Sequence, residues 1–370
     1  MELKNFEKQI TKTGFPLEHR IGEILRSSGW IVINNRYYVD DQEESIREID
    51  LVAYKVRQVQ HFKVFTTLII SCKKSEQNVW ALLARKNDAF DPNLDRQPVH
   101  IWTNDKALSF MLSQKRWPSE YYERAHELGV KHILSDPAVE VFAFQEMNRQ
   151  SGSPQNDRAI FSSITSLMKA QSYELDALPR RKKVPSVYQF NLVNVVDTEL
   201  IRLFFKKASH EATEVVEEHY IARHIVNKRD TFARIHFVCA SKFETTLKEY
   251  DRLHSANCKI FSESCDEFYE SVLSEGKRTQ VFMEEFGQEI RQALWLRLLR
   301  SSLHLDAKLE GTWLYWRDKE SLVEVMVPVS EEAIGFLNDD TKAKRSVAEA
   351  LAKWYRYTGP FRFAIDDVPF

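Results

Sequence analysis

The stretch LIISCKKS, residues 68–75, is a short apolar run that ends in a serine, a cysteine and two lysines. Because side chains alternate along a strand, Ser71 and Lys73 point to the same face. Upstream, REIDLVAYK (47–55) contains a second apolar run with an acidic residue, Asp50, inside it. Both runs are typical of strands buried on both faces. A carboxylate in such a strand is costly unless it is paired or binds a metal ion.

Two neighbouring strands would bring these polar groups together. We predict strands over residues 46–56 and 64–74, joined by the polar turn RQVQHFK. If the strands pair, Asp50, Ser71 and Lys73 converge on one patch of the sheet.

An amphipathic helix is predicted over residues 15–28, FPLEHRIGEILRSS. Its apolar residues follow a period of about 3.6, and a proline stands in the first turn, where it is well tolerated. Glu18 borders the apolar stripe and could reach the same patch as Asp50.

The order of these groups resembles the PD-(D/E)xK nuclease superfamily, which has the restriction-endonuclease-like fold. The match is Glu18 in FPLEHRIGEIL, Asp50 in REIDLVAYK and Lys73 in IISCKKS, and it covers roughly residues 10–90. In that family a helical glutamate, a strand aspartate and an acidic-x-lysine triplet surround Mg²⁺. Ser71 stands where many members have the glutamate of the triplet.

The resemblance implies a set of site residues and a metal. It implies catalytic positions at Asp50, Lys73, Glu18 and Ser71, and metal ligands at Asp50, Glu18 and the backbone carbonyl of Cys72. Magnesium, or manganese, would activate water for phosphodiester hydrolysis and neutralise charge on the phosphate.

Serine is a weak metal ligand, so the triplet is degenerate. Some members of the superfamily also carry S-x-K and take a carboxylate from the following helix. A helical pattern around residues 76–90 offers two candidates for this role, Glu76 and Asp88.

The residues also permit a structural interpretation. Asp50 could be a buried carboxylate paired with Arg47, Arg36 or Lys73 in a salt bridge, and Lys73 and its neighbour could simply end a strand in solvent. The leading hypothesis is a metal-dependent nuclease acting on DNA, of the kind that the resemblance links with restriction, repair or defence systems. The alternative is a catalytically inactive nuclease-fold protein that serves as a nucleic-acid-binding or assembly module.

The chain as a whole has 370 residues, of which 43% are hydrophobic and 29% charged, with a net charge of −2. This balance does not by itself indicate nucleic acid, so a binding surface must come from local clustering. The densest basic cluster is Arg180, Arg181, Lys182 and Lys183, which together with Lys74 are the predicted nucleic-acid contacts, although a solvated connector would have the same composition. A homodimer or a partner protein stays open.

The chain pattern predicts an α/β protein with a mixed central sheet flanked by helices. The predicted organisation is a nuclease-like core (1–147), a linker, helix and basic run (148–182), a second α/β unit (183–279) and a helical or mixed C-terminal region (280–370). Within the second unit, residues 187–197 and 199–205 look like a hairpin. No apolar run reaches the roughly 18 residues that span a bilayer, and we expect a cytoplasmic protein.

The four cysteines fit no metal-binding or disulfide framework. We therefore expect reduced, buried thiols. A zinc site shared by His254 and Cys258, which lie one helical turn apart, or by a wider set that includes His219 and His224, is the alternative.

Overall fold

The computed structural model describes residues 3–40, 45–87, 95–207, 209–303, 309 and 311–365. The chain forms two compact units. The first joins Met1–Asp105 with Lys115–Ser262, and the second joins Lys106–Gln114 with Glu263–Phe370.

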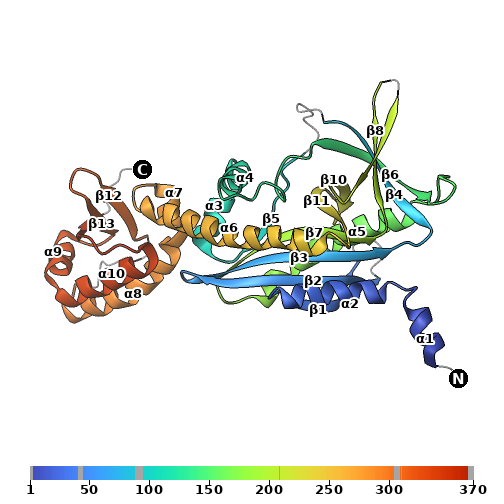
Figure 1. The fold of residues 1–370 in the computed structure, drawn as a ribbon. Helices are drawn as coiled ribbons and strands as arrows, with labels where there is room; N and C mark the ends of the chain where they lie inside the picture. The colour runs from blue at the N-terminus through green and yellow to red at the C-terminus, as the bar shows by residue number, and fades with distance from the viewer. Residues whose placement is uncertain are drawn as a thin grey trace. The chain divides into compact units, whose positions relative to one another are not determined.

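A seven-stranded mixed sheet is the centre of the first unit (Figure 1). Its order is β1-β2-β3-β7-β11-β10, with β5 paired to β7. Strands β3, β7 and β11 run parallel, whereas β1, β2 and β10 are antiparallel to the neighbours they pair with. The strands are β1 (Ile31–Val39), β2 (Ile46–Val59), β3 (Phe62–Lys74), β5 (His100–Thr103), β7 (Ser186–Asp197), β10 (Glu217–Val226) and β11 (Arg229–Cys239).

Helices cover this sheet on both faces, which confirms the predicted fold class. They are α2 (Phe15–Ser27), α4 (Trp117–Glu127), α5 (Arg158–Arg181) and α6 (Phe243–Glu270), while α1 (Leu3–Ile10) precedes them. The predicted helix over 15–28 is α2, and its C-terminal Gly29 adopts a positive φ of 79°, a conformation that favours glycine.

Side-chain contacts show which helix lies on which face. Asn194 of β7 donates a hydrogen bond of 2.6 Å to Ser163 of α5. Asn257 of α6 donates one of 2.9 Å to Thr66 of β3. Asn194 is aligned with Ser71 of β3. Since residues 66 and 71 of one strand point to opposite faces, α5 and α6 cover opposite faces of the sheet.

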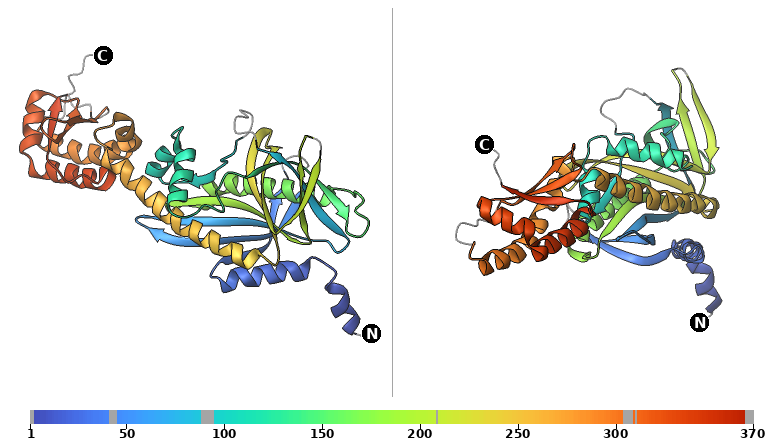
Figure 2. Two further views of the ribbon diagram at one scale, coloured as in Figure 1. Left: turned by 45° about the horizontal axis from the view of Figure 1, so that its top comes forward. Right: turned by 90° about the vertical axis from the view of Figure 1, so that its left-hand side faces the viewer.

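A second sheet in the same unit has the order β6-β4-β8-β9. Its strands are β4 (Asn78–Lys86), β6 (Val139–Asn148), β8 (Leu200–Phe205) and β9 (His210–Val215), and Figure 2 shows β8 and β9 as a projecting hairpin. The helix predicted around 76–90 was wrong, because the run VWALLA pairs with β6 and β8 as a strand. Pairing with strands far away in sequence overrides the helical preference of leucine and alanine.

The predicted hairpin of residues 187–197 and 199–205 was also wrong. Strand β7 pairs with β3 and β11, whereas β8 pairs with β4 and β9. The chain therefore changes sheets between Asp197 and Leu200, although both segments have the apolar pattern of strands.

The predicted division into four segments also differs from the two compact units that the chain forms. Residues 183–262 complete the sheet begun by β1 to β3 and do not form a separate α/β unit. The predicted linker, 148–157, is a turn between β6 and α5, in which Asn148 Oδ1 accepts hydrogen bonds from the backbone N–H groups of Gln150 and Ser151. Its exposure agrees with its composition, rich in serine, glycine, proline and asparagine.

The second unit contains a three-stranded sheet, β12-β13-β14, and a helical layer. Its elements are α3 (Lys106–Leu112), α7 (Gly276–Thr279), a 3₁₀ turn (Gln280–Phe282), α8 (Met283–Arg300), β12 (Trp313–Arg317), β13 (Leu322–Val327), α9 (Glu331–Asp339), α10 (Thr341–Tyr355) and β14 (Phe361–Ile365). Aromatic and aliphatic side chains from these elements form one core, as expected for this helical and mixed region. Among the described helices, none is long and apolar enough to cross a membrane.

Candidate functional site

The antiparallel pairing of β2 and β3 decides where the predicted site residues lie. Leu51 is aligned with Ile70, so the next step along the ladder places Asp50 beside Ser71. Ser71 is buried, with 1% of its surface exposed. The sequence prediction that these two residues share one patch agrees with this register.

Asp50 accepts three contacts from β3, all on its Oδ2 atom. The backbone N–H of Cys72 donates a hydrogen bond of 2.6 Å, and the Ser71 hydroxyl donates a longer one of 3.3 Å. The Lys73 ammonium lies 3.6 Å away as an ion pair. No hydrogen bond from a described residue reaches Oδ1. Asp50 is therefore held from one side and keeps one oxygen for another partner.

Glu18 belongs to the same electrostatic patch. Burial raises the pKa of its carboxyl above the ordinary value, the Asp50 carboxylate raises it further, and the Lys73 ammonium lowers it. Two carboxylates and one ammonium thus lie close enough to influence each other. A cation between the two carboxylates would relieve their repulsion.

The third implied ligand, the backbone carbonyl of Cys72, lies in the strand ladder. Cys72 is aligned with Val195 of β7, and burial raises the pKa of its thiol well above the usual range. Its side chain therefore acts as a buried apolar group. All four cysteines are buried, as predicted.

Of the two expected downstream carboxylates, the described one, Glu76, is engaged away from Asp50. Glu76 is exposed and pairs with Lys74 at 2.9 Å, and this hydrogen bond lowers the pKa of Glu76. The Lys74 ammonium also donates to the backbone carbonyl of Thr11. Asp88 lies outside the described residues. Of the proposed salt-bridge partners of Asp50, Lys73 is in place, while Arg36 pairs with Glu174 of α5.

The basic run at the end of α5 divides into two kinds of residue. Arg181 pairs with Glu174 at 2.8 Å, and the Lys182 ammonium lies over the rings of Phe65 and Tyr188. Arg180 and Lys183 are exposed, and their side chains form no ion pair or hydrogen bond with a described residue.

The basic run lies far from Asp50 along the sheet. Phe65 precedes Lys73 by eight residues on β3, which corresponds to about 26 Å at about 3.3 Å per residue. A nucleic acid that contacts both Lys182 and Lys73 would have to follow the strand for this distance.

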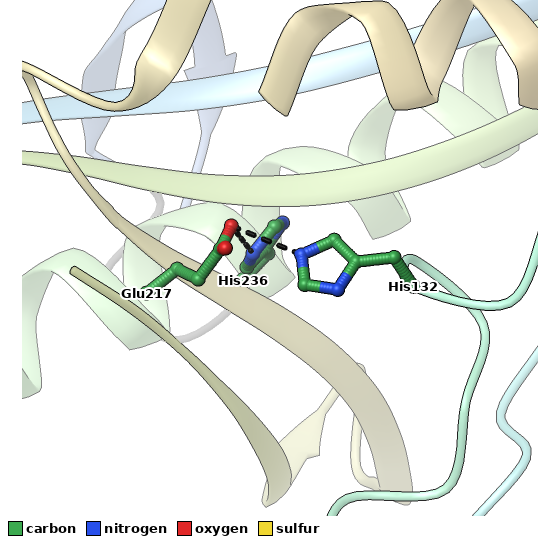
Figure 3. Close-up of side chains that lie close together, drawn as sticks. All are labelled: His132, Glu217 and His236. Carbon is green, nitrogen blue, oxygen red and sulfur yellow. Dashed lines mark ion pairs between the residues drawn. The ribbon is translucent and has the colours of Figure 1, made fainter. Parts of the chain in front are cut away.

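A second polar cluster lies on the sheet face covered by α6 and consists of His132, Glu217 and His236 (Figure 3). Glu217 Oε2 is 3.1 Å from Nε2 of His132 and 3.4 Å from Nε2 of His236. His132 is exposed in the segment after α4, whereas His236 is buried in β11. Glu217 begins β10, beside the other two ligand atoms.

Further groups fix this cluster. The Thr246 hydroxyl of α6 donates a hydrogen bond of 3.1 Å to Glu217 Oε2. Tyr250 Oη lies 3.1 Å from Nδ1 of His236. The ring of His219 stacks on that of His236 with centroids 4.2 Å apart. The cluster therefore combines two strands, one helix and one loop.

The protonation preferences follow from these contacts. Contacts with the rings of His236 and His132 lower the pKa of Glu217 to about 2. Burial lowers the pKa of His236 and, to a value well below the usual range, that of His219. The buried rings therefore favour the neutral form, which is the form that binds metal ions.

The histidines and the cysteine that the sequence offered as an alternative zinc site lie in different places. His219 borders the new cluster, but His224 points to the opposite face of β10, where it contacts Phe161. His254 and Cys258 do lie together, with Sγ and Nε2 3.9 Å apart. His254 also contacts the Thr66 hydroxyl, and burial lowers its pKa to about 4.

His132, Glu217 and His236 were missed by the sequence reasoning, because they come from three separate segments. A weak signal existed in the sequence spacing of Glu217 and His219, which are two residues apart, as are side chains on one face of a strand. Comparisons with known proteins find no family model, no curated protein and no solved structure that match this chain.

Proposed function

We propose that this protein is a nuclease-like phosphodiesterase that hydrolyses DNA with Mg²⁺ or Mn²⁺ at a degenerate site. The observation that carries the proposal is the convergence of Glu18, Asp50 and Lys73 from one helix and two paired strands. These residue types occur in the order that resembles the PD-(D/E)xK superfamily.

The donor set fits a hard divalent cation. Glu18 and Asp50 offer carboxylate oxygens, and burial together with the charge of Asp50 raises the pKa of Glu18. Magnesium binds through one or two carboxylates and keeps several waters, so these two residues are the ones that would hold it. The ion would supply charge neutralisation and an activated water when bound.

Lys73 and Ser71 have different roles beside these carboxylates. The Lys73 ammonium brings a compact positive charge that stabilises negative charge developing on a phosphate oxygen. The Ser71 hydroxyl donates to Asp50 and orients it, whereas a glutamate at this position would add a ligand. We therefore expect weaker metal binding than a site with a complete acidic triplet would have.

A second candidate is a nuclease-fold module that binds nucleic acid without cleaving it. The observation that favours it is the saturation of Asp50 Oδ2 by the Cys72 N–H, the Ser71 hydroxyl and the Lys73 ammonium. These contacts stabilise the carboxylate without a metal ion.

Incubation of the full-length protein with plasmid and single-stranded DNA separates the two candidates. Cleavage with Mg²⁺ or Mn²⁺ that stops with EDTA, and that is lost in Asp50→Asn and Lys73→Met, supports the nuclease. The control is Lys63→Met, which removes an exposed lysine from the same strand and should keep full activity. Binding of DNA without cleavage supports the module, and the absence of both contradicts the two candidates together.

A further inference from the structure

We infer that His132, Glu217 and His236 form a binding site for a divalent transition-metal ion of the zinc class. These residues lie on the sheet face covered by α6 (Figure 3), whereas Asp50 and Ser71 point to the face covered by α5. The site is therefore separate from that of the proposed nuclease function.

The spacing of the ligand atoms fits a tetrahedral ion. Bonds of about 2.0–2.1 Å to zinc separate two ligand atoms of a tetrahedron by about 3.3 Å. The two separations from Glu217 Oε2 are 3.1 Å to His132 and 3.4 Å to His236. All three ligand atoms lie within 4.8 Å of one another. Small side-chain shifts would therefore suffice to close the site around an ion.

The orientation of His236 gives an independent argument. Its Nε2 atom is buried and lies 3.4 Å from Glu217 Oε2, in an ion-pair contact that is not aligned as a hydrogen bond. Such a buried polar atom is uncommon and calls for an explanation. Its other nitrogen, Nδ1, lies 3.1 Å from the Tyr250 hydroxyl. Metal-binding histidines commonly donate this second N–H to a neighbouring oxygen, which leaves the first nitrogen for the metal.

The ligand types select the class of metal. Two imidazoles and one carboxylate suit zinc and other late transition metals better than magnesium, which prefers oxygen ligands. Three protein ligands leave one tetrahedral position for a water molecule or an anion. A cavity of about 30 Å³, room for one or two waters, lies beside His236 and Tyr250, and its lining does not include Glu217 or His132.

The charges around the site favour an anion at that fourth position. Arg234 precedes His236 by two residues on β11 and so shares its face of the sheet. Its guanidinium donates to the backbone carbonyls of Ser135 and Arg96, which hold it near the buried rings. Its positive charge opposes a bare dication but stabilises a metal-bound hydroxide or a carboxylate or phosphate oxygen.

Calorimetric titration of EDTA-treated, full-length protein with Zn²⁺ tests the site, and Co²⁺ absorption reports its geometry. We expect one Zn²⁺ per chain, a tetrahedral Co²⁺ spectrum, and an affinity about 100-fold lower in Glu217→Gln and in His132→Asn. His132 is exposed, so its variant should fold normally. The matched control is His224→Asn, on the same strand as Glu217 but on its opposite face, which should bind Zn²⁺ like the wild type.

Three results would overturn the inference. They are no binding of Zn²⁺, equal binding by wild type, Glu217→Gln and His132→Asn, or a loss of binding that occurs instead in His254→Asn. The titration does not depend on cleavage of DNA, so its outcome stands apart from that of the nuclease assay. A parallel titration with Mg²⁺ should show no difference between wild type and Glu217→Gln.

Discussion

Asp50 and Glu217 are two carboxylates of similar exposure on one sheet, and they are held by opposite kinds of partner. Their side chains are 19% and 16% exposed. Asp50 takes its contacts from the adjacent strand, through a backbone N–H, a hydroxyl and an ammonium. Glu217 takes its contacts from two imidazoles and the hydroxyl of Thr246. Burial alone therefore does not distinguish the two sites.

The two sites differ in the atoms that they offer to a metal ion. Around Asp50 the atoms that can bind a cation are oxygens, and the Lys73 ammonium lies 3.6 Å away. Around Glu217 the imidazoles of His132 and His236 offer nitrogen atoms as ligands. The first site suits a hard cation with its own water shell, and the second suits a transition metal.

The largest expected effect comes from a second carboxylate beside Asp50. In Ser71→Glu a hydroxyl that donates to Asp50 is replaced by a like charge at a position that is 1% exposed. In EDTA we expect a loss of about 3–5 kcal/mol in the free energy of unfolding, the order found when a buried charge lacks a partner. Mg²⁺ should restore much of this loss, as measured by urea unfolding with and without the ion.

Thr67→Glu is the matched control for this prediction. Thr67 lies on the same face of β3 and is 3% exposed, but it is four residues away from Ser71. Its variant should be destabilised in the same way, and Mg²⁺ should not restore it. If Ser71→Glu is equally insensitive to Mg²⁺, the patch around Asp50 is a structural salt bridge and not a metal site.

The Asp50 patch could be predicted from the sequence because its members follow from local rules. Side-chain alternation places Ser71 and Lys73 together, and one hairpin brings Asp50 to them. Only the position of Glu18 depended on how its helix packs, and the apolar period of that helix indicated which side faces the sheet. The fold class and the helix over 15–28 could be predicted for the same reason.

The Glu217 cluster could not be predicted in this way. His132 lies in a loop, Glu217 and His236 lie on two strands, and Tyr250 lies on a helix, so their meeting depends on tertiary packing. Strand β4 illustrates the same limit, because its sequence favours a helix and its pairing with β6 and β8 decides otherwise. The periodicity of a sequence describes one helix or strand at a time, whereas the Glu217 cluster and the pairing of β4 each depend on several elements.

Each site should be stabilised by its own metal ion. At a free concentration about 100 times its Kd, an ion that binds the folded state stabilises it by about 2.7 kcal/mol. We expect Zn²⁺ to stabilise wild type and Asp50→Asn by this amount but not Glu217→Gln. Mg²⁺ should stabilise Glu217→Gln but not Asp50→Asn. Chemical unfolding of the three proteins with each ion measures this stabilisation. If both variants lose their response to the same ion, the two groups of residues do not form separate metal sites.

A smaller effect is expected from the group that orients His236. Tyr250→Phe keeps the ring and removes the hydroxyl that lies 3.1 Å from Nδ1. Loss of an outer contact of this kind lowers metal affinity by about 10–100-fold, and we expect the lower end because the imidazole stays packed against His219. Zinc titration measures the change. An unchanged affinity would mean that the tyrosine only fills space beside the ring.

The smallest expected effect concerns the basic run, which should affect the binding of nucleic acid but not the binding of either metal ion. Arg180 and Lys183 are exposed, whereas Arg181 and Lys182 are engaged with Glu174 and aromatic rings. Each phosphate contact contributes about 0.9 to the slope of log affinity against log salt. Replacing Arg180 and Lys183 with glutamine should therefore lower the slope by up to about 1.8 and leave the melting temperature unchanged.

Replacement of the engaged pair provides the contrast for that measurement. Arg181→Gln removes an ion pair to Glu174, which is 14% exposed, so the variant should melt at a lower temperature. Fluorescence anisotropy with labelled duplex DNA at several salt concentrations gives the slope for each protein. If the slope stays constant after replacement of Arg180 and Lys183, the run is a solvated helix end, and any contact with DNA must be sought nearer to Lys73. Because Phe65, beside Lys182, and Lys73 are about 26 Å apart along β3, the result also decides which end of the sheet a DNA duplex approaches.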